Sequence, residues 1–237
     1  MRPLPADQIV FAVASPPAVA PPVEWALQSP SLIVYGSGRV LRAITSAGRH
    51  TVPSAYSVGQ VEAQQVARFV ATVGRSGLLD SDFGEPRVSD LRSTRVWLHG
   101  ADGEQRASAY GLDHDNDNYV SWVYRLRRRR LRSLIDNGFA LAGDTGTPYE
   151  PERVFVIEPA VHRDTSEATV RWPGPDPVSF LHAPGPRSPS VQACGEIDGP
   201  AAGELYAAAR SSEDQRWLLG GRTRALVVNP FPIDLDC

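Results

Sequence analysis

The sequence contains no lysine, so all 24 of its basic side chains are arginine. We interpret this as a bias toward GC-rich codons rather than as selection for bidentate recognition. The 27 acidic residues leave a formal net charge of −3. Such a balance gives no global attraction to nucleic acid or to an anionic membrane, although it allows a local basic patch.

Long apolar runs are also missing. No stretch reaches the roughly 18 apolar residues of a membrane-spanning helix, so a span is excluded on length. The apolar run from Ile9 to Ala14 is shorter than the core of a secretory signal, so we expect no export signal in the chain as written. A cytoplasmic protein is the simplest interpretation, and a mature or truncated form that has lost a leader is the alternative.

Cysteine is scarce, with only Cys194 and Cys237 present. Two separated cysteines without CxxC spacing or histidine neighbours do not predict a zinc site, because structural zinc needs four ligands at characteristic spacing. A bond between them would close a loop of about 43 residues, worth about 4 kcal/mol on the chain-entropy estimate. It would also imply an oxidising compartment. The residues alone leave the bonded and free forms equally open.

The clearest structural signal is an antiparallel hairpin over Asp90 to Leu112, with Ala101-Asp102-Gly103-Glu104 as its turn. This turn pairs Leu98 with Ala107 and Val96 with Ala109. One side of the hairpin then carries only apolar side chains, Val96, Leu98, Ala107 and Ala109, which we expect a helix to cover. The other side is an amphipathic surface made of Arg95, Trp97, His99, Arg106 and Tyr110.

Further elements are predicted from apolar periodicity, caps and turn residues. Ser57 and Gln60 form a capping box for a helix over Ser57–Gly74, whose apolar stripe is Val66, Phe69, Val70 and Val73. The remaining elements are a strand at 8–14, a hairpin at 31–44 turned by Gly36-Ser37-Gly38, a helix at 119–141, a strand at 152–159, a strand at 191–197, a helix near Pro200, and a hairpin at 215–228.

These elements predict an α+β fold. A mostly antiparallel sheet would combine the strand at 8–14, the first two hairpins and the strand at 152–159, with two helices on one face. We expect a main domain at residues 1–160, a proline-rich linker or strap at 161–190, and a small C-terminal α/β appendage at 191–237.

The second helix carries six arginines between Arg125 and Arg132. We expect a solvated helix face, with Arg125 and Arg129 available to a partner. Binding of phosphate or nucleic acid by this helix is the alternative, and it is disfavoured because no aromatic interleaving or known nucleic-acid module accompanies the arginines.

Two patterns resemble ligand loops without matching them. The acidic run at 113–118 lacks the glycine and the bidentate glutamate of a calcium-binding loop, since Asn118 and Tyr124 stand at those positions. We interpret it as a cap for the following helix. Gly36-Ser37-Gly38 lacks the third glycine and the helix of a phosphate-binding loop. The sequence therefore indicates no cofactor and no metal.

Taken in order, a set of short motifs resembles a group of uncharacterised actinobacterial secreted proteins and putative lipoproteins. The motifs cover most of the chain and comprise Tyr35, Gly36, Gly38, Arg39, Asp90, Thr94, Tyr110, Leu112, Arg128, Leu131, Pro151 to Val154, Trp172 to Gly174, Cys194, Trp217 and Cys237. The resemblance implies that the two cysteines pair and that the protein works outside the cytoplasm. It implies no activity.

No constellation of nucleophile, base and orienting group is visible, so we expect a non-catalytic binding or cell-envelope interaction protein. Its partner would be an unidentified protein or envelope component, and nothing in the sequence specifies an oligomeric state. The alternative is a hydrolase-type enzyme in which His99 acts as general base beside Asp90 or Glu104.

Overall fold

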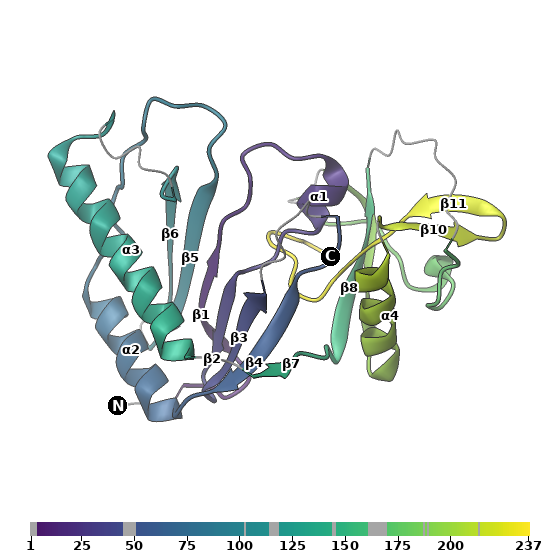
Figure 1. Cartoon of the computed structure of the whole chain (residues 1–237), viewed down its shortest axis with the longest axis horizontal. Helices are drawn as coiled ribbons and strands as arrows, with labels where there is room; N and C mark the ends of the chain where they lie inside the picture. Colours follow the sequence, from purple (N-terminus) through teal and green to yellow (C-terminus); the bar gives the residue numbers. More distant parts are fainter. Residues whose placement is uncertain are drawn as a thin grey trace. The chain divides into compact units, whose positions relative to one another are not determined.

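The structure is a computed structural model, and it describes residues 4–44, 51–101, 103–113, 119–143, 146–160, 170–186, 188, 190–212 and 214–237. The chain divides into two compact units (Figure 1). Unit 1 contains Met1–Val19, Pro30–Ile44 and Tyr56–Tyr149, and unit 2 contains Ala20–Ser29, Thr45–Ala55 and Glu150–Cys237. Both units combine helices with antiparallel strands, which confirms the predicted α+β class.

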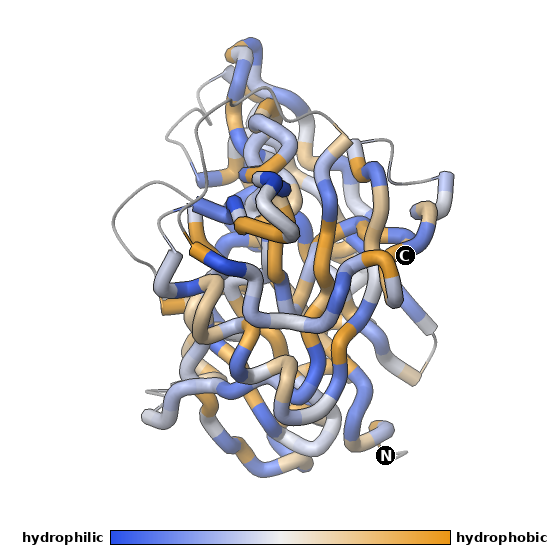
Figure 2. Tube along the Cα trace, turned by 90° about the vertical axis from the view of Figure 1, so that its right-hand side faces the viewer, coloured by the Kyte–Doolittle hydropathy of each residue, from blue (hydrophilic) through white to orange (hydrophobic). Residues whose placement is uncertain are grey.

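Unit 1 is built on a seven-stranded sheet in the order β6-β5-β1-β2-β3-β4-β7. The strands are β1 (Ile9–Ala14), β2 (Leu32–Tyr35), β3 (Arg39–Ile44), β4 (Ala55–Gln60), β5 (Ser93–Gly100), β6 (Gly103–Tyr110) and β7 (Thr147–Pro148). The predicted hairpin with glycines at its turn is β2–β3, and Gly38 takes a positive φ of 89°. Apolar and hydrophilic stretches alternate along the chain, as the orange and blue parts of the tube in Figure 2 show.

The hairpin predicted over Asp90 to Leu112 forms as β5–β6, but its register differs from the predicted one by two residues. Val96 pairs with Ala107 and Leu98 with Gln105, so the innermost pair is Gly100 with Gly103. Because side chains alternate along a strand, a shift of two residues keeps each side chain on its expected face. Val96, Leu98, Ala107 and Ala109 are accordingly all buried. Asp102 of the predicted turn lies outside the described residues.

The predicted start of the first long helix is wrong. Ser57 and Gln60 lie in β4, and helix α2 runs from Ala63 to Arg75. Tyr56 explains the difference, because its ring is buried and its hydroxyl donates to the Pro30 carbonyl at 2.6 Å, which holds this segment in the sheet. Sheet formation therefore overrides the capping box. The apolar stripe of the helix is as predicted, since Val66, Val70 and Val73 are buried.

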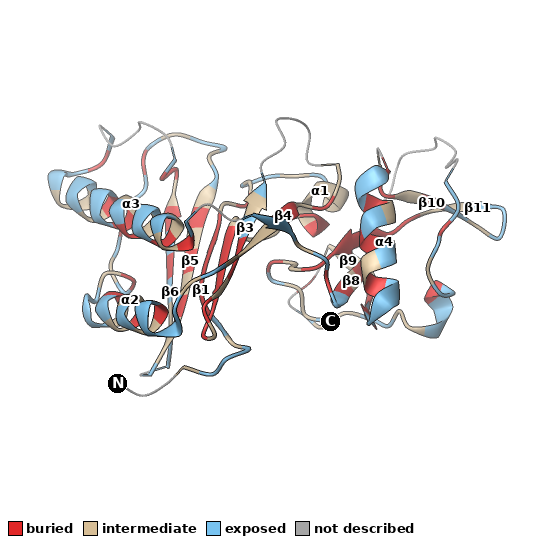
Figure 3. Ribbon diagram, turned by 60° about the horizontal axis from the view of Figure 1, so that its bottom comes forward, coloured by how far each residue is buried: buried red, intermediate tan, exposed pale blue. Residues whose placement is uncertain are grey.

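Helices α2 and α3 (Trp122–Ala142) cover one face of the seven-stranded sheet (Figure 1). Their buried residues lie along the side that faces the strands (Figure 3). Gly138 lets α3 approach closely, because a Cβ atom there would lie 2.6 Å from the ring of Phe11 and 3.4 Å from Leu32. No helix in the described part of the chain is both long and apolar enough to cross a membrane.

Unit 2 is built on a three-stranded sheet in the order β12-β8-β9. Its strands are β8 (Arg153–Pro159), β9 (Val191–Asp198) and β12 (Val227–Asn229). Helix α4 (Pro200–Ser211) shares a core with Val154, Ile197 and Trp217, and the short helix α1 (Pro22–Ala26) packs near Ile157 and Val227. The hairpin of β10 (Arg216–Leu219) and β11 (Arg222–Ala225) turns at Gly220-Gly221, as predicted.

The predicted strand at 152–159 forms, but the prediction that it joins the main sheet is wrong. As β8 it pairs with β9 and β12, and it does not join the sheet of unit 1. The last passage of the chain from unit 1 to unit 2 lies between Tyr149 and Glu150, and two earlier segments, Ala20–Ser29 and Thr45–Ala55, also belong to unit 2. Local pattern predicts a strand, whereas its partners depend on segments about 40 and 70 residues further along the chain.

The described part of the proline-rich segment packs within unit 2. Trp172 is buried, its ring meets Trp217 edge to face at 5.3 Å, and its indole N–H donates to the Pro175 carbonyl at 2.7 Å. A single turn of 3-10 helix follows at Pro177–Ser179. Trp172 and Pro177 are therefore buried in unit 2, while most other described residues of the segment are intermediate or exposed.

Cys194 and Cys237 form a disulfide, with their Cα atoms 5.7 Å apart. Cys194 is buried in β9, and Cys237 is exposed. The pairing implied by the family resemblance is thus present, and it ties the final segment of unit 2 to the edge of the three-stranded sheet.

Candidate functional site: a groove between two helices

The amphipathic side of the β5–β6 hairpin contains the predicted residues Arg95, Trp97, His99, Arg106 and Tyr110. This side lies opposite the face that the helices cover. Trp97 pairs across the strands with Arg106. Trp97 is half-buried and Arg106 is exposed. The Tyr110 hydroxyl accepts a hydrogen bond from the Leu91 N–H at 2.9 Å. Tyr110 therefore has a structural role at the end of the strand.

Of the two carboxylates that could orient His99 as a general base, only Glu104 lies near it. The cross-strand partner of His99 is Glu104. Asp90 precedes the opposite end of β5, and the first residue of that strand, Ser93, is about 20 Å along the strand from His99. The Glu104 carboxylate accepts from Arg106 Nε at 2.7 Å, and this hydrogen bond lowers the pKa of Glu104. The acid that could orient His99 is therefore engaged by an arginine.

Arg125 and Arg129 are exposed on α3, and their side chains make no hydrogen bond to any described residue. They lie on the helix layer, while the hairpin residues lie on the other face of the sheet. The predicted interaction surface is therefore two separate surfaces. In the acidic run at 113–118, the Asp113 carboxylate accepts from the Thr94 hydroxyl at 3.2 Å, and residues 114–118 lie outside the described residues.

Arg128 was expected on the solvated face of α3, and the structure places it in the interior with no exposed surface. Its guanidinium donates to the carbonyls of Tyr110 at 2.9 Å, Gly111 at 2.6 Å and Gly84 at 3.4 Å. Arg132, one turn later, donates to the Leu112 carbonyl at 2.8 Å. These bonds fasten α3 to the end of β6 and to the loop that follows α2.

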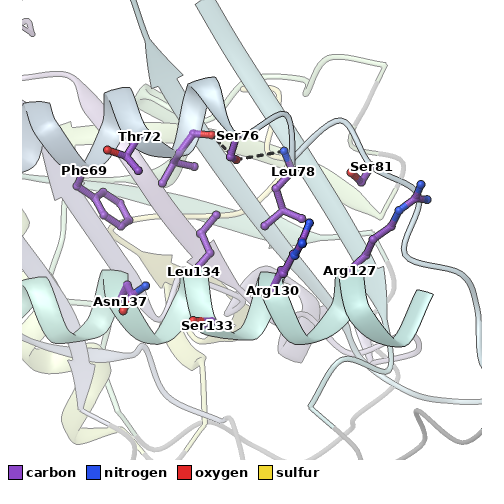
Figure 4. A pocket seen from close by; sticks show the side chains of 11 residues that line it. Phe69, Thr72, Ser76, Leu78, Ser81, Arg127, Arg130, Ser133, Leu134 and Asn137 are labelled. Carbon is purple, nitrogen blue, oxygen red and sulfur yellow. Dashed lines mark hydrogen bonds between the residues drawn. The ribbon is translucent and has the colours of Figure 1, made fainter. Parts of the chain in front are cut away.

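A groove of about 480 Å³ runs between α2 and α3 within unit 1 (Figure 4). Its apolar lining comes from both helices and from the loop after α2, where Leu78 and Leu134 point toward each other. Phe69 closes one end, and its ring stands edge to face on Phe11 at 5.0 Å. The Phe69 side chain is thereby held in place by the sheet below it.

Small polar side chains border the apolar lining. Thr72 on α2 donates to the Arg68 carbonyl at 2.9 Å, and Ser76, which caps the end of α2, donates to the Val73 carbonyl at 2.6 Å. On α3, Ser133 and Asn137 are exposed and make no hydrogen bond to the described part of the chain. The groove thus offers an unused hydroxyl and an unused amide beside its apolar surface.

Two arginines lie at the end of the groove opposite Phe69 (Figure 4). Arg127 donates to the Asp82 carbonyl at 3.0 Å, and Arg130 makes no hydrogen bond to a described residue. The Asp82 carboxylate accepts from the Gly84 N–H at 2.9 Å and from the Tyr124 hydroxyl, and these bonds lower the pKa of Asp82. Asp82 therefore offsets part of the charge of Arg127, while Arg130 keeps its charge available.

Sequence reasoning did not identify the groove, although one signal was present. Two pairs of small polar residues are four positions apart, Thr72 with the α2 cap residue Ser76 and Ser133 with Asn137 on α3. Each pair lies beside the apolar stripe of its helix. No spacing in the sequence, however, indicates that the two helices are neighbours.

No protein-family model, no curated protein and no solved structure matches this chain.

The contribution of Arg128 can be tested by Arg128→Met. Loss of its hydrogen bonds leaves buried carbonyl groups unsatisfied, so we expect the free energy of unfolding to fall by about 3 kcal/mol. Arg129→Met removes an exposed neighbour and should change it by less than about 0.5 kcal/mol. Urea unfolding followed by circular dichroism measures both. Equal losses in the two variants would show that Arg128 does not anchor the helix.

Proposed function

We propose that this chain is a non-catalytic binding protein, and that its α2–α3 groove takes an acidic amphipathic helix from a partner protein. The observation that carries the proposal is the groove itself, with apolar walls along its length and arginines at one end. Its lining residues supply apolar surface, hydrogen-bond donors and positive charge, and they include no histidine and no carboxylate. Such a lining is suited to recognition.

The dimensions of the groove favour a short helix. Along α3 it extends from Arg127 to Asn137, which is about 15 Å at the rise of an α-helix. A partner helix of two to three turns spans that length. Helices that bind in this way place apolar side chains at i, i+3 or i+4, and i+7 into the groove. Phe69, Leu78 and Leu134 provide the surface for those side chains.

The charges determine the orientation of the partner. Arg130 and Arg127 lie at the end of the groove away from Phe69, so acidic residues of the partner would lie at that end. Exposed charge pairs contribute modestly to affinity, typically 0.2–1 kcal/mol each, and they contribute more to selecting the partner. The apolar contacts would supply most of the affinity.

The experiment is selection of peptides from a random displayed library on the whole protein. We expect enriched peptides to have apolar residues at helical spacing and aspartate or glutamate near one end. For a selected peptide, Arg127→Met with Arg130→Met should weaken binding about tenfold, equivalent to about 1.4 kcal/mol. Fluorescence anisotropy measures the change.

Arg125→Met with Arg129→Met is the matched control, because it removes the same charge from the same helix outside the groove. This control should bind the selected peptide with less than a twofold change. Failure to enrich such peptides, or equal weakening by the two double variants, would refute the groove as the site. If the protein instead binds single-stranded nucleic acid with an affinity that falls steeply as the salt concentration rises, the phosphate-binding alternative would be supported.

We also propose that the protein works outside the cytoplasm, on an envelope component or an extracellular partner. The disulfide supports this, because such bonds persist in oxidising compartments. The resemblance to secreted actinobacterial proteins is consistent with a location outside the cytoplasm. Thiol counting on the unreduced protein from its native cells should find no free cysteine, and two reactive thiols would contradict this location.

A further inference from the structure

His182 lies beside the disulfide of unit 2, and in the sequence it precedes Cys194 by 12 residues and Cys237 by 55. Its Nε2 atom is 3.8 Å from the Cys237 sulfur, and the ligand atoms of His182, Cys194 and Cys237 all lie within 4.8 Å of one another. Sequence reasoning set zinc aside because neither cysteine has a histidine neighbour along the chain. The fold supplies that histidine.

The backbone holds this arrangement without help from the disulfide. His182 and Cys194 form an antiparallel bridge, in which each N–H donates to the other residue's carbonyl at 2.9 Å. The segment before Cys237 is held separately, since the Gly185 N–H donates to the Asp236 carbonyl at 2.7 Å and the Asp236 N–H donates to the Ser188 hydroxyl at 2.9 Å. All three side chains would therefore stay close after the sulfur–sulfur bond is broken.

The imidazole of His182 is oriented as a metal ligand. Its Nδ1 atom lies 3.3 Å from the Phe180 carbonyl oxygen. A proton on Nδ1 donated to that carbonyl leaves the lone pair of Nε2 directed at Cys237, which is the arrangement that metal-binding histidines commonly have. In a tetrahedral zinc site a nitrogen and a sulfur ligand are about 3.6 Å apart, close to the separation present here.

We propose that His182, Cys194 and Cys237 form a zinc site when the disulfide is reduced, so that the oxidation state of the cysteines controls metal binding. A dithiol reductant donates two electrons, the sulfur–sulfur bond breaks, each sulfur gains a proton, and the reductant closes its own disulfide. Zn²⁺ then displaces both thiol protons to solvent and is bound by the two thiolates and His182 Nε2. His182 and Cys237 are exposed, so water completes the coordination.

Cobalt(II) is the probe, because thiolate ligands give it a charge-transfer absorption and tetrahedral sites give it strong visible bands. The whole chain is reduced with a dithiol, freed of reductant without air, and titrated with Co²⁺ followed by Zn²⁺. We expect one Co²⁺ per reduced chain, displaced by Zn²⁺, and no such absorption in the oxidised chain. His182→Ala should weaken cobalt binding more than 100-fold, beyond the roughly 10–100-fold effect of losing an outer-shell partner.

His99→Ala is the control, since His99 belongs to unit 1, and it should bind cobalt as the unchanged chain does. Far-ultraviolet circular dichroism accompanies every titration. If reduction unfolds the chain, cobalt should restore its signal in the unchanged protein and not in His182→Ala. Absence of the thiolate absorption, failure to restore the signal, or equal binding by His182→Ala would overturn the proposal.

Discussion

The buried guanidinium of Arg128 is the interaction on which the arrangement of unit 1 depends most. It brings a permanent charge into the interior, and the carbonyls of Tyr110, Gly111 and Gly84 stabilise it there. A buried charge is tolerated only when its donors are satisfied, so α3 can occupy one position along the end of β6. Further along the same helix, Gly138 allows close contact with Phe11. These two contacts determine where the helix lies on the sheet.

The groove follows from that placement. Helix α2 packs on the sheet through Val66, Val70 and Val73, and α3 packs beside it, so the surface between them combines the edges of both apolar stripes with exposed polar side chains. Arg127 lies next to the anchoring Arg128, and its bond to the Asp82 carbonyl joins the loop after α2 to the same helix. The walls of the groove are therefore held in place before a partner binds, which would limit the entropic cost of binding.

Sequence reasoning succeeded where a pattern is local and failed where partners are distant. The apolar stripe of α2 and the buried side of the β5–β6 hairpin follow from side-chain periodicity. A two-residue error in register does not change which side of a strand is buried. The capping box at Ser57 failed because β4 gains sheet hydrogen bonds and buries Tyr56. Arg128 could not be predicted as buried, since its acceptors come from two separate segments, Tyr110–Gly111 and the loop at Gly84. The proximity of His182 to Cys194 likewise depends on an isolated strand bridge that no spacing encodes.

Arg128 fixes the distance between the groove walls before any partner binds. Spin labels at Thr72→Cys and Asn137→Cys report that distance by pulsed electron–electron double resonance, because both positions are exposed and the native cysteines are bonded to each other. We expect one narrow distance distribution in the otherwise unchanged protein and a broad one in Arg128→Lys, which keeps the charge but cannot reach all three carbonyls. Equally narrow distributions in both proteins, or a broad one in each, would contradict this role of Arg128.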